Sequence, residues 1–447
     1  MTAFKRKLCP YEKFLWFPDR TPTNFNVSII TEVEGHLNID SLKDAISLVQ
    51  SRHSLSSVSV KGKSNPYFKY EKNIPIPIRH VQLYSESDCK KEIEHELHTP
   101  FNLSKGPLIR FLIIEGKDSD KVIITGDHLI VDGIGLSSFL IEVLNITLTN
   151  QKLKMKRYPK RTLQTPIAER LKKNRKPYNK ASLYQLDKTS ISDAEEFAGQ
   201  ISKIDATGIL SKYLSTTETE QIIKSSKAND VSVQSMLFSA AILAISEKIR
   251  KEQNILKPIP IQYECPVNLR PYLKKSRCSN QLHCSIGILN FNLEVHPNDT
   301  FWDLAVKTKQ ELQEAVMPGF EVNVVTQFSK ISNSVKNFED LRALRSWKGP
   351  TVGVSNLGVI GKNAHEKIKR LSVLGNLHGT FYSENNFYLV VATFKNSLAI
   401  NFFYPKPLMS EQKASNLLDD ICNTLVEESL QFTEEVSPKL PFFSLHS

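Results

Sequence analysis

Residues 121–133 have the sequence KVIITGDHLIVDG, in which an apolar stretch runs into a short polar turn. Residues 121–125 predict a buried strand, and the apolar residues between positions 135 and 148 recur at helical spacing. His128 therefore stands in a strand-to-helix turn, where a rigid scaffold commonly holds catalytic side chains. The imidazole group has a pKa near neutral pH, which suits a general base.

The same turn contains Asp132 and Gly133. Glycine tolerates a positive φ, so Gly133 permits a sharp turn that can bring His128 and Asp132 close together. The bare pattern His-x-x-x-Asp-Gly is weak, because a histidine after a strand is more often a structural residue than a catalytic one.

The flanking sequence alternates strands and helices, which predicts an α/β fold class. In the first half we expect strands at 26–33 and 108–115 and a helix at 40–49 that Asp40 or Ser41 can cap. In the second half we expect helices at 232–249, 300–316 and 411–430 and strands at 259–265, 285–295, 388–394 and 397–404. The last two strands would form an antiparallel pair through Lys395-Asn396.

The chain has 447 residues, of which 40% are hydrophobic and 23% are charged, as in globular proteins of two or three domain-sized units. The six cysteines are scattered without a Cys-x-x-Cys pair, which favours buried free thiols in a reducing compartment and no zinc or other metal site. No apolar run approaches the ~18 residues of a spanning helix. We therefore expect a soluble cytoplasmic protein without signal peptide or transmembrane segment.

The net charge of +11 comes from one segment. Residues 152–180 contain twelve Lys and Arg and the single acid Glu169, so the rest of the chain is neutral overall. We interpret residues 151–200 as a basic crossover linker that is either solvated or docks an anionic donor, an acidic partner or a membrane surface. Nucleic-acid binding is disfavoured, because the only interleaved aromatic residues are Tyr158 and Tyr178.

Other chemistries lack their motifs. The sequence has no Gly-x-Ser-x-Gly elbow of a serine hydrolase and no glycine loop that could cradle phosphate. Glycine is scarce throughout, at 17 residues.

The turn at His128 resembles the His-x-x-x-Asp-Gly signature of the CoA-dependent acyltransferase superfamily. That superfamily includes chloramphenicol acetyltransferase, alcohol acyltransferases, polyketide-associated acyltransferases and peptide-synthetase condensation domains. Further segments resemble the family in the same order along the chain: LCPYEKFLW at 8–16, RHSL at 52–55, PFNL at 100–103, GPLIR at 106–110, PVNLRP at 266–271 and SNLG at 355–358.

Two positions depart from the family pattern. Asp127 stands where many members, condensation domains above all, have a first histidine, and the Asp-Phe-Gly-Trp-Gly motif of the plant branch is absent. These departures weaken the resemblance to condensation domains and exclude close kinship with the plant branch, and the SNLG segment at 355–358 resembles free-standing alcohol acetyltransferases and polyketide-associated acyltransferases most.

The resemblance implies a pseudo-dimer of two chloramphenicol-acetyltransferase-like halves, residues 1–150 and 201–447, with an active-site channel between them. It implies that His128 is the general base, and that Asp132 pairs with Arg270 to pin the His128 loop to the other half. Ser355 and Asn356 would line the channel or polarise an oxyanion, unless they serve only as turn residues. We expect a monomer with no permanent cofactor.

On this interpretation the chain transfers an acyl group from a thioester donor, acyl-CoA or an acyl carrier protein, to a small-molecule alcohol rather than an amine. Two alternatives remain within the family. One is a condensation-type enzyme that uses a carrier-protein thioester to form an amide or ester. The other is a non-catalytic relative that keeps the fold, although the intact His128, Asp132 and Gly133 argue against it.

Overall fold

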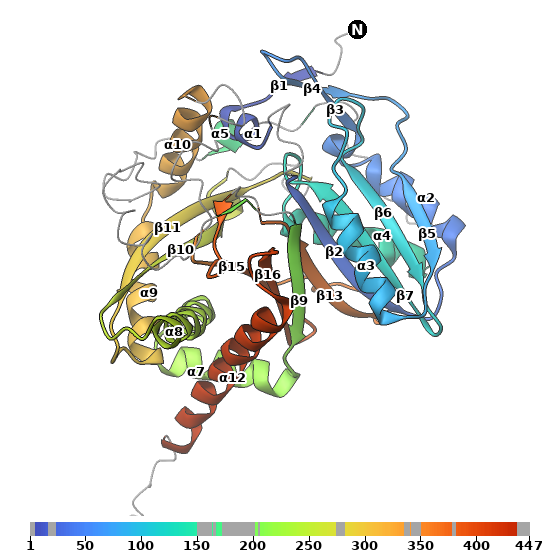
Figure 1. Ribbon diagram of the computed structural model, residues 1–447. Helices are drawn as coiled ribbons and strands as arrows, with labels where there is room; N and C mark the ends of the chain where they lie inside the picture. Colours follow the sequence, from blue (N-terminus) through green and yellow to red (C-terminus); the bar gives the residue numbers. More distant parts are fainter. Residues whose placement is uncertain are drawn as a thin grey trace, which may run out of the picture.

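The computed structural model describes residues 5–16, 24–149, 163, 167–171, 202–203, 206–273, 282–334, 340, 350–377 and 381–435 (Figure 1). These residues form two lobes, each built on a β-sheet with helices packed against it, as the α/β prediction expects. The basic segment 152–180 lies outside the described residues, apart from Leu163 and residues 167–171.

The first lobe contains a mixed sheet with the strand order β13–β2–β7–β6–β5. Along this order the pairs β13–β2, β2–β7 and β7–β6 are antiparallel, and the pair β6–β5 is parallel. Their bounds are Ile368–Gly375 (β13), Asn26–Glu34 (β2), Ser119–Asp127 (β7), Ile109–Glu115 (β6) and Ile78–Gln82 (β5).

Helices cover both faces of this sheet. The helices α2 (Ile39–Gln50) and α4 (Gly133–Thr149) pack on one face and α3 (Glu86–His98) packs on the other. Side chains of a strand alternate between its faces. Ile124 accordingly lies in the main core with Phe139 of α4, whereas Ile123 packs with Cys89 of α3.

The elements predicted in the first half are confirmed, with one change at a helix end. The strands at 26–33, 108–115 and 121–125 are β2, β6 and β7, and the two helices are α2 and α4. The helix α2 is capped by Asn38, whose side chain accepts the N–H of Ser41, so the predicted cap at Asp40 or Ser41 is wrong. Asn38 takes this role because it precedes the first helical residue and its amide oxygen can reach a free backbone donor.

Several short elements lie outside the two large sheets. A small sheet has the order β1–β4–β3, and the helix α1 begins just after β1. The bounds are Lys5–Lys7 (β1), Pro10–Leu15 (α1), Ser54–Ser57 (η1), Val58–Lys61 (β3), Tyr67–Tyr70 (β4), Ile167–Arg170 (α5), Ser202–Lys203 (β8) and Phe381–Tyr382 (β14).

The second lobe contains a mixed sheet with the order β11–β10–β12–β15–β16–β9. The strand β12 is parallel to both of its neighbours, and the other pairs are antiparallel. The bounds are Ile286–Val295 (β11), Ile259–Asn268 (β10), Val352–Val359 (β12), Phe387–Phe394 (β15), Ser397–Lys406 (β16) and Ala206–Tyr213 (β9).

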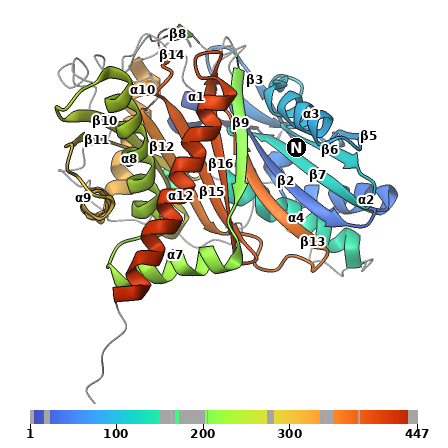
Figure 2. The ribbon, with the colours of Figure 1, turned by 60° about the horizontal axis from the view of Figure 1, so that its bottom comes forward.

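The helices α7, α8 and α12 pack on the sheet face that points away from the first lobe (Figure 1), whereas α10 packs on α1. Figure 2 shows the long α12 running across β16 and β9. The predicted strands and helices of this half are confirmed, including the β15–β16 hairpin. The helical bounds are Thr216–Ala228 (α7), Val233–Gln253 (α8), Arg270–Tyr272 (η2), Phe301–Ala315 (α9), Phe320–Ser334 (α10) and Glu411–Glu435 (α12).

The hairpin turn shows why its sequence permits so tight a connection. Lys395 and Asn396 have φ values of 48° and 64°, so both adopt the left-handed conformation. Two consecutive residues of positive φ match the right-handed twist of the flanking strands.

The two lobes share a strand. The strand β13, from the second half of the sequence, pairs antiparallel with β2 from Gly375–Val27 to Ile368–Val33, with one irregularity near Arg370. It therefore extends the sheet of the first lobe, although the chain on both sides of it belongs to the second.

A buried amide joins β13 to the sheet of the second lobe. The Asn401 side chain, fully buried on β16, accepts hydrogen bonds from the hydroxyls of Ser211 (2.7 Å) and Ser372 (2.8 Å) and donates to the carbonyl of Val390 (3.2 Å). Ser211 lies on β9 and Ser372 on β13, so one side chain links strands of both sheets.

Among the described residues, no single helix combines the length and apolar character needed to cross a membrane. Only α7 and α8 taken together have that length and apolar character, and these two helices meet at a bend of 101°.

Replacing Asn401 by Ala should lower the free energy of unfolding by about 1–3 kcal/mol, because the buried Ser372 hydroxyl loses its partner, as do the Val390 carbonyl and the exposed Ser211 hydroxyl. Urea denaturation measures this change. Asn292→Ala, at an exposed position of β11, is the matched control and should change stability by less than ~0.5 kcal/mol. Equal midpoints for the two variants would show that the Asn401 network contributes nothing.

Candidate active site

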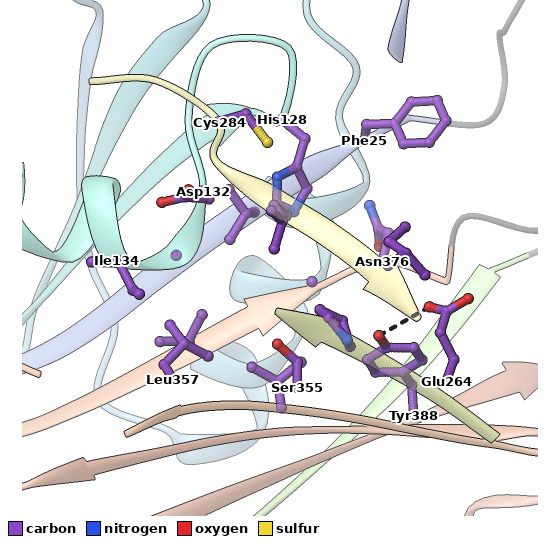
Figure 3. Close-up of a pocket in the computed structure, with 18 of the residues that line it drawn as sticks. Phe25, His128, Asp132, Ile134, Glu264, Cys284, Ser355, Leu357, Asn376 and Tyr388 are labelled. Atoms are coloured by element: carbon purple, nitrogen blue, oxygen red, sulfur yellow. Dashed lines mark hydrogen bonds between the residues drawn. The ribbon is translucent and has the colours of Figure 1, made fainter. Parts of the chain in front are cut away.

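A cavity of about 200 Å³ lies between the two lobes (Figure 3). Its walls come from β2, β13 and the His128 turn of the first lobe, and from β10, β11, β12, β15 and β16 of the second. The helices α1 and α10 close another side, where Tyr11 and Phe14 both pack on Phe328 with ring centroids 4.8 Å apart. The cavity is far larger than the space of a single water, so it can hold part of a substrate.

His128 borders this cavity at the end of β7. Its backbone N–H donates to Phe25 (2.7 Å), and its ring Nδ1 lies 3.0 Å from the carbonyl oxygen of Val131. A carbonyl oxygen can only accept, so Nδ1 must carry the hydrogen of this bond. The neutral imidazole then has its unprotonated nitrogen at Nε2, which is the form that a general base requires.

Asp127 holds the turn that presents His128. Its side chain accepts the N–H of Leu129 at 2.9 Å, and its carbonyl accepts the N–H groups of Ile130 and Val131. Leu129, Ile130 and Val131 are buried, so the turn is anchored in the core on both sides of the histidine. Asp127, which stands where many family members have a first histidine, therefore supports the structure of the turn.

The structure brings Asp132 and Arg270 together across the two lobes. The two guanidinium nitrogens of Arg270 donate to the two carboxylate oxygens of Asp132 at 2.7 and 2.8 Å. Asp132 also accepts the backbone N–H of Ser285 (2.8 Å) at the start of β11, and Arg270 donates to the carbonyl of His283 (3.2 Å). Bidentate geometry of this kind fixes orientation as well as distance.

Asp132 is also the residue that precedes α4. Its side chain accepts the N–H of Gly135 at 2.9 Å, and its carbonyl accepts that of Leu136. A carboxylate at this position satisfies a free backbone donor and interacts favourably with the helix dipole. One buried side chain thus caps the helix after His128 and binds the opposite lobe.

The electrostatics of the pair favour the ionised carboxyl. Burial alone would raise the pKa of Asp132, but the charge of Arg270 and its hydrogen bonds outweigh burial and lower this pKa to about 2. The carboxylate is therefore ionised at any physiological pH.

Gly133 has a different role from the predicted one. It is the first residue of α4 and is not among the residues of positive φ, so the prediction of a left-handed turn is wrong. A Cβ at this position would lie 2.6 Å from Leu357 and 3.2 Å from Val373. Glycine is needed here because strands β12 and β13 approach the start of the helix closely.

Ser355 and Asn356 lie on β12 and line the cavity opposite the His128 turn. The Asn356 side chain accepts the N–H of Gly358 at 2.9 Å, and Gly358 has a φ of 68°. Asn356 therefore stabilises the irregularity at which β12 shifts its register against β15, and residues 355–358 do not form a turn. The Ser355 side chain faces the cavity (Figure 3).

The sequence did not point to two further polar residues of the cavity wall, Glu264 and Tyr388. They lie on β10 and β15, and the Tyr388 hydroxyl donates to the Glu264 carboxylate at 3.1 Å (Figure 3). In the segment 259–265, Glu264 stands at an alternate position between apolar residues, a pattern that normally indicates a solvent-facing side chain. Only the second lobe's position against the first turns that strand face into a cavity wall.

The profile of the Condensation domain family matches residues 15–435 of the chain. The chain belongs to this family. Asp127, in place of the first of two histidines, does not exclude that membership. The family assignment and the two-lobed fold agree with the resemblance to the CoA-dependent acyltransferases, and family membership supports acyl transfer in general terms.

Two curated relatives match part of the chain. Cyclo-acetoacetyl-L-tryptophan synthase of Aspergillus oryzae is 29% identical over 141 residues, which are 30% of this chain and 4% of that protein. The N-acetyltransferase SLI1 of Saccharomyces cerevisiae is 26% identical over 155 residues, which are 32% of each chain.

Two solved structures share the fold over nearly the whole chain. The trichothecene 15-O-acetyltransferase TRI3 of Fusarium sporotrichioides has a TM-score of 0.71 at 12% identity and covers 95% of both chains. The starter condensation domain of rhizomide synthetase, solved as a mutant in complex with C8-CoA and Leu-SNAC, has a TM-score of 0.62 at 10% identity and covers 96% of this chain and 95% of its own.

Asp132→Ala and Arg270→Ala should each destabilise the protein by about 3–5 kcal/mol, because each leaves a buried charge without its partner. The double variant should be less destabilised than the sum of the two. A double-mutant cycle on chemical denaturation measures the coupling. The exposed pair Asp40–Lys43 is the control and should show little coupling; a cycle for Asp132 and Arg270 that is equally additive would contradict the proposed energetics.

The stability advantage of wild type over Asp132→Asn should shrink as the pH falls. The folded pKa of about 2 lies below the ordinary value of 3.8, so ionised Asp132 stabilises the fold fully above that ordinary value. The advantage is then lost as the pH falls from about 4 to about 2. Thermal unfolding of both proteins across this range tests it, and a constant difference would be the contrary result.

Proposed function

We propose that the chain is an O-acyltransferase that moves an acyl group from a thioester, with acyl-CoA as donor, to the hydroxyl of a small molecule. The observation that carries the proposal is the His128 ring at the cavity, whose Nδ1–H is engaged by Val131 and whose Nε2 is therefore the basic nitrogen. The similarity to an O-acetyltransferase and to a domain solved with an acyl-CoA supports the choice of donor and acceptor classes.

The reaction needs one base and one activated carbonyl. As the acceptor oxygen bonds to the thioester carbon, Nε2 of His128 takes the hydroxyl proton. The tetrahedral intermediate then collapses, the carbon–sulfur bond breaks, and the imidazolium returns the proton to the departing thiolate. No covalent acyl-enzyme is required, because the thioester is already activated.

Other residues of the site have supporting roles in this proposal. Ser355, which faces the cavity, would donate a hydrogen bond to the oxyanion of the intermediate. Asp132 and Arg270 do not react; their pair keeps the His128 turn of one lobe in register with the cavity wall of the other. The second lobe therefore contributes to catalysis through position.

A condensation reaction on a carrier-protein thioester is the second candidate. It is favoured by the family profile and by the similarity to synthetases that the curated comparison found. The similarity to an N-acetyltransferase adds an amine as a possible acceptor. In each case the same histidine would take the proton of the attacking group, so only the substrates differ.

His128→Ala should lower kcat by about 10²–10⁴-fold, the usual contribution of a general base, while the folded state is retained. Product formation by mass spectrometry, with a panel of acyl-CoAs and alcohols, gives the rate, and thermal unfolding reports the fold. His80→Ala, on β5 away from the cavity, is the matched control and should keep full activity.

Near-normal turnover of a folded His128→Ala protein would contradict general-base catalysis by His128. The same panel should include acyl groups loaded on a carrier protein and amine acceptors. Product formed only from the carrier-bound donor, or only with amines, would identify the condensation alternative.

A further inference from the structure

One row of residues crosses the sheet of the second lobe beneath the cavity. Glu264 on β10 stands in register with Gly353 on β12, Gly353 with Tyr388 on β15, and Tyr388 with Phe403 on β16. Residues in register point to the same face of a sheet. The side chains of this row therefore share the cavity side, and Glu264, Tyr388 and Phe403 line it.

The glycine in this row makes the contact between its neighbours possible. A Cβ on Gly353 would lie 2.0 Å from Cδ2 and 2.1 Å from Cε2 of the Tyr388 ring. The ring therefore lies across the bare backbone of β12 and carries its hydroxyl to the Glu264 carboxylate at 3.1 Å. The pair spans two strand spacings, which a side chain on the middle strand would prevent.

Glu264 has an unusual environment for a carboxyl group. Among the described residues its side chain has Tyr388 as hydrogen-bond partner and no Lys, Arg or His as ion-pair partner. Burial raises its pKa to about 7, against the opposing effect of the Tyr388 hydrogen bond. Glu264 is half-buried and lines the cavity, and a carboxylate there with spare acceptor capacity is costly unless another donor reaches it.

The amide of Asn290, next to Glu264 on β11, also has spare hydrogen-bonding capacity. Its Nδ2 is buried and has no hydrogen-bond partner within the described residues. Two apolar residues of the cavity wall, Val390 and Phe403, lie beside Tyr388. A polar group that is built into an apolar wall selects ligands, because a ligand without the matching group leaves it unsatisfied.

We propose that Glu264 and Tyr388 form a recognition site for a second hydrogen-bond donor, a hydroxyl or an ammonium group, on the acceptor. The preferred acceptors are then diols or amino alcohols rather than simple alcohols. The proposal rests on the acyl-transfer function above. The donor's acyl chain is apolar and would gain nothing at this position, so the pair belongs to the acceptor. Gly353 acts as a positioning residue, since it lets the Tyr388 ring reach Glu264.

The test compares an unbranched primary alcohol with the diol and the amino alcohol of the same chain length, with the second group placed at increasing distance from the reacting hydroxyl. Wild-type protein should prefer one of the bifunctional acceptors in kcat/KM by about 10- to 100-fold. Glu264→Leu should reduce that preference to near unity by raising the acceptor KM, with the donor KM unchanged. Tyr388→Phe and Gly353→Ala should reduce it in part.

Gln262→Leu is the matched control. Gln262 lies on β10 one pleat from Glu264 and does not line the cavity, so this variant should keep the wild-type preference. An equal preference in wild type and Glu264→Leu would overturn the proposal, as would a change confined to the donor KM.

The pH dependence of binding separates the two kinds of donor. Glu264 is ionised above its pKa of about 7 and neutral below it. An amino alcohol should therefore bind more tightly as the pH rises from 6 to 8, while a diol should show little change, and Glu264→Gln should abolish the trend. The other titratable side chains that line the cavity are Tyr11, His128, Asp132, Arg270, Cys284, Tyr382 and Tyr388.

Equilibrium binding of the acceptors to donor-free His128→Ala protein removes the histidine from the profile. It also separates the two proposals. If bifunctional acceptors bind preferentially but no acyl product ever forms, the recognition site stands and the acyl-transfer function fails. If product forms without any preference, the recognition site fails alone.

Discussion

The carboxylate of Asp132 takes hydrogen bonds from Arg270, Ser285 and Gly135, so one buried side chain joins three parts of the chain. Arg270 follows β10 and Ser285 precedes β11, two strands of the second lobe, while Gly135 lies in the first turn of α4. His128 is only four residues away, held between Asp127 and the same helix. The turn that carries His128 is thus tied to the second lobe by this charge pair, so its position depends on how the two lobes pack.

Neighbouring side chains approach closely at two glycines near the cavity. Gly133 admits Leu357 and Val373 to the start of α4, and Gly353 admits the Tyr388 ring across β12. Neither residue uses the freedom of φ for which glycine is usually selected. In both cases the missing side chain is what counts, since it leaves room for Leu357 and Val373 at the start of α4 and for the Tyr388 ring over β12.

Much of the architecture could be predicted because its signals are local. Apolar periodicity indicated the strands and helices, and the family resemblance indicated a histidine at the cavity and the pairing of Asp132 with Arg270. The Asn38 cap and the role of Gly133 depend on atoms at the helix starts that periodicity does not specify. Glu264 could not be found, because a glutamate at an alternate strand position indicates solvent until the opposite lobe is placed over it. The exchange of β13 between lobes likewise leaves no trace in the sequence pattern.

The strand β13 leaves the second lobe, pairs with β2 in the first, and returns. A ladder of peptide hydrogen bonds thereby holds a strand from the second half of the chain in the sheet of the first lobe. This connection adds to the side-chain contacts between the lobes at the cavity. A hinge motion that separates the lobes would have to displace the chain on both sides of β13, or else break the β13–β2 ladder at a free-energy cost close to that of local unfolding. We therefore expect substrates to enter and leave through small local movements at the rim of the cavity, while the two lobes keep their relative position.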